Sequence, residues 1–139
     1  MARTAAQVSP RLIALALPGI PESVPIARRQ VRAALGSRGL GKYAEDAEII
    51  TSELVANAVQ HACEDGTGTI GVILTHAGTP AAVTVAVSDS SPQVPVRRAT
   101  PAGSEQGRGL QIVGALSAHW GWRCEGGRKV VFAVLAREG

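Results

Sequence analysis

Residues 43–62 limit the possible folds more than any other segment, because both their apolar and their polar residues recur at helical spacing. Small and aliphatic residues recur on one side at the 3.6-residue period of a helix: Ala47, Thr51, Leu54, Val55, Ala58 and Ala62. The opposite side carries polar residues at positions i, i+4, i+7 and i+8, namely Glu53, Asn57, Gln60 and His61. We therefore expect a long helix from Tyr43 to Ala62 that packs on a core and presents a polar stripe.

The segments around this helix alternate between strand and helix patterns. We expect strands over residues 11–17, 69–76, 81–88, 120–125 and 129–136. Ser23 should cap a helix that runs from about Pro25 to Leu35. Its inward side would consist of Ile26, Val31, Ala34 and Leu35. A further helix is expected over residues 107–119, with an apolar side of Leu110, Ile112, Val113 and Leu116.

This order of elements predicts an α+β fold. Several expected strands follow one another directly and pair as hairpins, so the sheet is either a mixed sheet or an antiparallel one. With helices on one face of that sheet, the fold class is a two-layer α/β sandwich. The 139 residues suffice for one domain, which we place at residues 11–136, and residues 1–10 are expected to form a disordered N-terminus.

The segment 89–106 lacks apolar periodicity and contains Pro92, Pro95 and Pro101. A loop of this length in a small domain is usually a functional lid or a disordered segment. Arg97 and Arg98 in this loop could contact phosphates or simply be solvated.

The composition excludes some classes of function. Aromatic residues make up only 3% of the chain, which argues against single-stranded nucleic-acid binding because that depends on aromatic stacking. The net charge is +3, with basic groups in residues 1–44 and acidic groups in residues 45–65, so internal complementarity or an acidic partner is more plausible than DNA. Cys63 and Cys124 form no CxxC pair, and we expect two free, buried thiols. Without an apolar run of transmembrane length, a cytoplasmic protein is expected.

The polar stripe of the long helix has the residue types of magnesium and phosphate chemistry. The amide oxygen of Asn57 is a hard neutral ligand for Mg²⁺, and Glu53, one turn earlier, can take a proton from an attacking hydroxyl or water. A solvated helix face is the alternative, and His61 is better explained as a helix-end residue than as a metal ligand.

Two further positions have a structural and a functional interpretation. Asp89 ends a strand, where it either starts a turn or faces a ligand at the sheet end. Gly107, Arg108, Gly109 and Leu110 lie where a loop turns into a helix, and such a junction offers backbone N–H groups to an anion or is merely flexible. The chain matches neither the P-loop nor the GxGxxG pattern there.

Taken in order, three segments of the chain resemble the GHKL ATPase superfamily: SELVANAVQHA at 52–62, VAVSD at 85–89 and GRGLQIV at 107–113. They are similar to the N-box helix, the strand that ends in the adenine-binding aspartate, and the box that closes the ATP lid. The flanking segments RRQVR at 28–32, WGW at 120–122 and VVF at 130–132 narrow the resemblance to small anti-sigma-factor serine kinases. The resemblance covers about residues 11–136.

The resemblance implies ATP and Mg²⁺ as cofactors and assigns roles to individual residues. Glu53 would be the general base, Asn57 the Mg²⁺ ligand and Asp89 the acceptor for the adenine amino group. The segment Gly107, Arg108, Gly109 and Leu110 would bind the phosphates, with backbone approach at the two glycines. The family's DxGxG pattern has glycines where this chain has Ser91 and Gln93.

The first hypothesis is accordingly an ATP-dependent serine/threonine protein kinase that phosphorylates a small antagonist protein and regulates transcription by partner switching. It could also bind a sigma factor directly, and it could form a homodimer. The alternative is a noncatalytic, nucleotide-gated binding module, which the missing glycines favour. A third and weaker hypothesis is a small basic nucleic-acid binder. Neither direct nucleic-acid contact nor a membrane is expected under the first hypothesis.

Overall fold

The computed structural model describes residues 10–62, 68–78, 81–90 and 108–136. These residues form five strands, three α-helices and one 3₁₀ turn in the order β1 (Arg11–Pro18), α2 (Ser23–Ser37), η1 (Gly41–Tyr43), α3 (Ala44–Ala62), β2 (Thr69–Gly78), β3 (Ala81–Asp89), α4 (Arg108–Leu116), β4 (His119–Glu125) and β5 (Arg128–Ala136). The expected sequence of strands and helices is confirmed.

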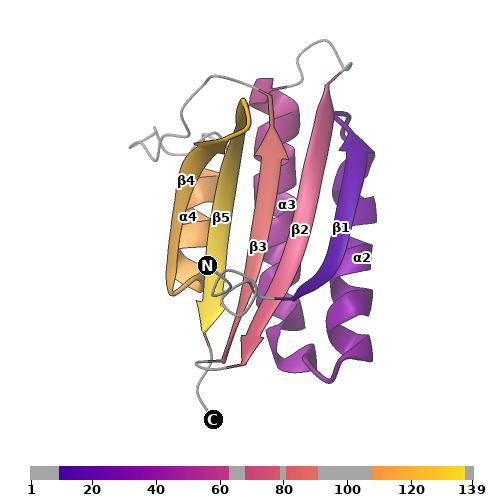
Figure 1. Cartoon of the computed structure of the whole chain (residues 1–139), viewed down its shortest axis with the longest axis vertical. Helices are drawn as coiled ribbons and strands as arrows, with labels where there is room; N and C mark the ends of the chain where they lie inside the picture. The colour runs from indigo at the N-terminus through magenta and orange to yellow at the C-terminus, as the bar shows by residue number, and fades with distance from the viewer. Residues whose placement is uncertain (1–9, 63–67, 79–80, 91–107, 137–139) are drawn as a thin grey trace, which may run out of the picture.

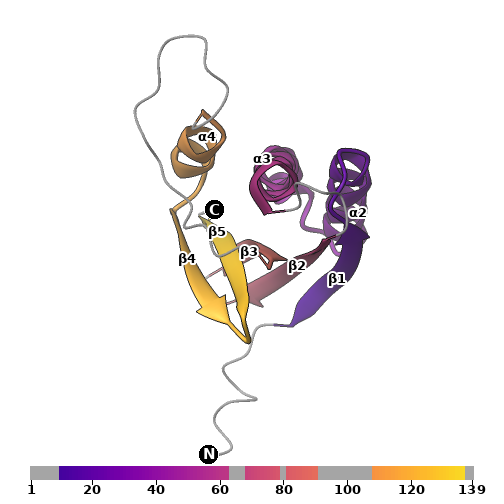
Figure 2. The same ribbon diagram turned by 90° about the horizontal axis from the view of Figure 1, so that it is seen from above.

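The strands form one sheet in the order β1-β2-β3-β5-β4, and every adjacent pair is antiparallel. Figure 1 shows this order, and Figure 2 shows all three helices on one side of the sheet. The α+β two-layer sandwich is confirmed, whereas a mixed sheet is wrong and the antiparallel alternative holds. The connections explain this result. The α2–α3 pair joins β1 to β2 so that these strands run in opposite directions, and the β2–β3 and β4–β5 hairpins also reverse the chain.

The core lies between the sheet and the helices. Each strand contributes alternate side chains to it, as Val83, Val85 and Val87 of β3 do. The buried face of α3 contains five of the expected residues: Ala47, Thr51, Leu54, Val55 and Ala58. Ile50 is buried in addition, and the side chain of Ala62 lies outside the described residues. Aliphatic residues thus build the core, and Tyr43 is a fully buried aromatic side chain within it.

Helix α2 begins earlier and faces inward differently than expected. Ser23 lies inside the helix, and its hydroxyl donates to the Pro18 carbonyl at 2.6 Å instead of capping the helix. The buried stripe follows the i, i+4 row from Ser23 through Ala27 and Val31 to Leu35. Ile26 lies off that row and is 38% exposed, so its predicted inward position is wrong.

Helix α4 ends at Leu116, earlier than predicted, because the residues that follow already belong to the sheet. The backbone N–H of Ala118 donates to the Val134 carbonyl at 2.7 Å, and His119 already pairs with Val134 in the sheet. Leu110 and Val113 face the core as expected, but Ile112 is 38% exposed, which corrects its predicted place on the buried side.

The last hairpin, β4–β5, turns at Gly126 and Gly127, whose φ angles of 56° and 80° lie in the left-handed region that glycine tolerates. Cys124 on β4 is free but exposed, so the expectation of a buried thiol is wrong there. Cys63, the N-terminal residues 1–9 and residues 91–106 of the expected lid lie outside the described residues.

The sheet has two distinct ends. Asp89 pairs with Lys129 at one end, where α4 also begins. Arg11 and Ala136, the first and last strand residues, lie at the opposite end, opposite Thr75 of β2 and Ala82 of β3 respectively. We call the end with Asp89 the site end of the sheet.

Candidate functional site

The site end of the sheet gathers the residues that the sequence singled out. Strand β3 finishes there with Asp89, β5 starts there, and α4 begins there and descends to β4 at the other end. Figure 1 shows α3 running toward the same end as β3. Segments far apart in the sequence therefore meet at the site end of the sheet, between α3, α4 and the ends of β3 and β5.

Asp89 forms a buried ion pair at the site end of the sheet. The Nζ atom of Lys129 lies 3.6 Å from Oδ2 of Asp89, and the two side chains are only 5% and 2% exposed. Removing either charge from water is costly, and the partner offsets part of that cost. The end of β3 thus holds a carboxylate fixed by the register of two paired strands, facing the helix layer.

Glu53 of α3 is directed at the first turn of α4. A Cβ atom placed on Gly109 would lie 2.8 Å from Oε1 of Glu53, closer than real Cβ contacts come. Glycine at position 109 therefore permits the α4 backbone to approach this carboxylate. The contact joins two of the sequence-predicted site residues, which lie 56 positions apart in the chain.

The remaining predicted residues divide into those that the structure places and those that it does not describe. Asn57 is half-buried one turn beyond Glu53, and Gln60 is exposed. Leu110 is 5% exposed and packs in the core, so its side chain serves α4 packing. Gly107 and the side chains of His61 and Arg108 lie outside the described residues, as do Arg97 and Arg98.

The donor set at the site end fits a magnesium nucleotide. A buried carboxylate such as that of Asp89 accepts hydrogen bonds and would suit an exocyclic amino group. Gly109 provides a backbone position that a side chain would obstruct, and such positions suit close approach by phosphates. The carboxylate of Glu53 and the amide of Asn57 are oxygen donors of the hard type that Mg²⁺ prefers.

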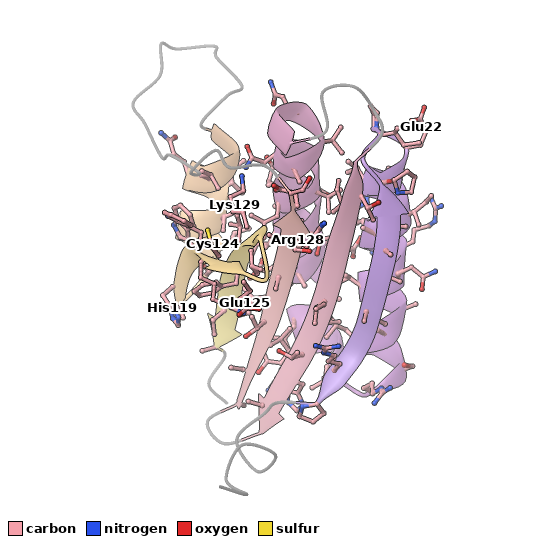
Figure 3. All side chains as sticks on the ribbon, turned by 45° about the horizontal axis from the view of Figure 1, so that its top comes forward. Glu22, His119, Cys124, Glu125, Arg128 and Lys129 are labelled. Atoms are coloured by element: carbon pink, nitrogen blue, oxygen red, sulfur yellow. The ribbon has the colours of Figure 1, made fainter. Side chains whose placement is uncertain are left out.

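Lys129 is the residue that sequence reasoning missed. Its signal was the alternation of β5, in which Lys129 shares the inward parity of Val131, Ala133 and Leu135. A lysine with that parity requires a buried acceptor, and the end of β3 supplies one in Asp89. Figure 3 shows Lys129 beside Arg128 at the start of this strand.

A comparison with protein families identifies the class of domain. Residues 17–134 match the profile of the histidine kinase-like ATPase domain, and this range includes Glu53, Asn57, Asp89 and Gly109. Because the match covers most of the chain, the protein belongs to the histidine kinase-like ATPase domain family. Membership in this family implies ATP binding. A search of curated proteins found no significant match.

A solved structure has the same fold. The chain is similar to the crystal structure of the RsbU and RsbW domains of Rv1364c from Mycobacterium tuberculosis, with a TM-score of 0.65 and 22% sequence identity. The match covers 92% of this chain and 32% of that one, so this chain spans about a third of the length of its structural neighbour. Among the described residues, none of the helices has the length and apolar character needed to cross a membrane.

Proposed function

We propose that this protein is an ATP-dependent serine/threonine kinase of the anti-sigma-factor type, with residues 11–136 as its catalytic domain. The observation that carries the proposal is the approach of Glu53 to Gly109, because it directs a carboxylate at the helix start where the family resemblance places the phosphates. The name of the RsbW domain in the structural neighbour supports the same class.

In the proposed site, each residue has one task. Asp89, oriented by its pairing with Lys129, accepts a hydrogen bond from the adenine amino group. The backbone at Gly107, Arg108, Gly109 and Leu110 lies along the phosphates. Asn57 holds Mg²⁺, which when bound neutralises phosphate charge.

Glu53 acts as the general base of this reaction. It accepts the proton of the substrate serine hydroxyl as the serine oxygen bonds to the γ-phosphorus and the bond to the β-phosphate oxygen breaks. The products are ADP and a phosphoserine on a small antagonist protein. Phosphorylation of the antagonist, and direct binding of a sigma factor, would regulate transcription by partner switching in the cytoplasm. A homodimer is compatible with this scheme.

The test separates binding from catalysis at Glu53. Replacing Glu53 by Gln keeps the size of the side chain but removes the basic carboxylate, so Mg-ATP should bind almost as well while phosphorylation falls by about 10²–10⁴-fold. Asn57→Ala should weaken both Mg²⁺-dependent binding and turnover. Calorimetry with ATP and transfer of labelled phosphate to antagonists from the same organism give the two readouts. Equal kinase activity in Glu53→Gln would remove Glu53 from the reaction.

The alternative proposal is a noncatalytic module whose partner binding depends on nucleotide. Ser91 and Gln93, in place of two glycines of the family pattern, favour it. In that case the wild-type protein binds ATP and its partner but transfers no phosphate, and Glu53→Gln leaves partner binding intact. Asp89→Asn should weaken ATP binding under both proposals, because an amide donor would then face the adenine amino group.

A further inference from the structure

The face of the sheet opposite the helices carries apolar side chains among polar ones. Val130, Phe132 and Val134 of β5 point to this outer face, as do Ile73 of β2 and Ala86 of β3. An antiparallel sheet with one solvated face normally carries polar residues there. Figure 2 shows no helix on this side. Apolar side chains on a face without helices offer a contact surface for a binding partner.

The outer face is also hollowed. A groove of about 540 Å³ crosses it, and every strand contributes to its lining. Its floor includes three small residues in adjacent register, since Gly71 pairs with Ser88, and Ala86 of the same strand pairs with Ile73. A Cβ on Gly71 would lie 2.5 Å from the Ser88 hydroxyl, so the floor depends on glycine at that position. Phe132, paired with Ala86, forms a wall of the hollow.

The charges around this groove are predominantly positive. Arg11, Arg123 and Arg128 line it together with the single acidic residue Glu125. Arg123 forms an ion pair with Glu125, and its guanidinium lies 5.2 Å from the centre of the Phe132 ring. This ion pair neutralises the one acidic residue of the lining, so Arg11 and Arg128 carry the net positive charge of the groove.

Arg128 is held at the site end of the groove by neutral acceptors. Its Nη2 donates to the carbonyls of Thr69 at 2.7 Å and Ser88 at 3.2 Å. These bonds fix the guanidinium, which lies opposite Glu125 in the β4–β5 register but forms no ion pair among the described residues. Figure 3 places Arg128 and Glu125 at the same end of the β4–β5 hairpin.

Arg11 marks the opposite end of the groove. It is exposed and pairs with Thr75, which in turn pairs with Thr84 of β3. Thr84 pairs with Val134 of β5, so Arg11 is level with Val134, six residues from Arg128. Arg11 and Arg128 are therefore about 20 Å apart along the strands and about 14 Å apart across them. The groove therefore has an apolar centre between two positive ends at a defined separation.

We propose that this groove docks an extended acidic segment of a partner protein, with an apolar side chain in the hollow and a carboxylate at each end. In an extended chain, residues of the same parity point to one side, and residues i and i+6 span about 20 Å, a distance that the long arginine side chains can match. The matching motif is two acidic residues about six positions apart, with an apolar residue of the same parity between them.

A second copy of this chain fits the groove less well. A symmetric contact places the same patch on both subunits, so it would bring Arg11 and Arg128 of both copies together with too few carboxylates. The proposal does not depend on the kinase assignment, because the groove lies on the other side of the sheet from Glu53 and Asp89.

The experiment selects ligands from a displayed library of random peptides against the full-length protein. Selected peptides should carry the acidic, apolar, acidic pattern, and labelled copies then give affinities by fluorescence anisotropy. Arg11→Glu places a negative charge at one end of the groove, and Ala86→Phe fills the hollow. Each should weaken binding at least about tenfold. Arg28→Glu, at an exposed position on α2, is the matched charge control and should leave the affinity within about twofold.

Several outcomes would overturn the proposal. These are a selection that enriches no peptide, enriched peptides without acidic residues, and affinities that survive Ala86→Phe. A dimer in sedimentation that Ala86→Phe dissociates would assign the face to a second copy instead. Cooperative thermal melting of all three variants establishes that lost binding is not lost folding.

Discussion

Two neighbouring residues of β5, Arg128 and Lys129, show how different the two faces of this sheet are. Both are cations at the site end, but their side chains point to opposite faces. Lys129 is buried under the helix layer and pairs with a carboxylate, whereas Arg128 lies on the outer face and donates to backbone carbonyls. The difference teaches that a charge on the inner face requires a partner charge, while on the outer face water and neutral acceptors suffice.

The largest effect should come from removing one partner of the buried pair. Lys129→Met leaves the Asp89 carboxylate buried without its ammonium partner, and we expect the free energy of unfolding to fall by about 3 kcal/mol. Arg128→Met, the matched change on the outer face, should cost about 1 kcal/mol. Urea denaturation of both variants measures the two values.

A double variant checks that the pair itself is responsible. Adding Asp89→Leu to Lys129→Met also removes the buried carboxylate and should recover part of the lost stability. If Lys129→Met and Arg128→Met destabilise the protein equally, the contrast between the two faces is not electrostatic.

Shortening an apolar side chain should likewise cost more stability on the inner face of the sheet than on the outer face. Val85 of β3 is fully buried on the inner face, and Val85→Ala should cost about 2 kcal/mol through lost burial and a residual cavity. Val134 of β5 is half-buried on the outer face, so Val134→Ala should cost less than about 1 kcal/mol. Equal losses in thermal or chemical unfolding would indicate that the outer face is already covered in solution, for example in an oligomer.

A small effect of the opposite sign is expected at Tyr43. The hydroxyl of Tyr43 is buried in the helix layer and has no hydrogen-bond partner among the described residues. Tyr43→Phe removes this unsatisfied group and keeps the ring that Lys42 covers at 5.5 Å, so stability should rise by about 1 kcal/mol. In calorimetry this corresponds to a melting temperature a few degrees higher. A lower melting temperature would mean that the hydroxyl is hydrogen-bonded in solution.

The sequence predicted the elements well where one periodicity dominated. Helix α3 was assigned by its 3.6-residue pattern, and β3 by a strand pattern over residues 81–88, directly before Asp89. These two elements carry most of the candidate site, so its strand and long-helix residues were predictable too. The approach of Glu53 to Gly109 needed the packing of α3 on α4, which no local pattern contains.

The failures have specific physical causes. Ser23 was assigned as a cap because a serine before a proline is typical of helix starts, but its bond to the Pro18 carbonyl lets it be buried inside α2. The end of α4 depends on Ala118 reaching Val134, which is a long-range contact. The apolar outer face of β5 could not be distinguished from its inner face, because Phe132 and Val131 are both typical of a buried strand.

The position of the described chain ends has a practical consequence. Arg11 and Ala136 lie at the end of the sheet remote from Asp89 and Lys129. A fluorescent reporter, an affinity tag or a further domain attached through either end would therefore lie away from the proposed nucleotide site. Surface immobilisation through these ends would orient the proposed ATP site toward solution, which makes the domain a convenient module for sensors and for single-molecule measurements.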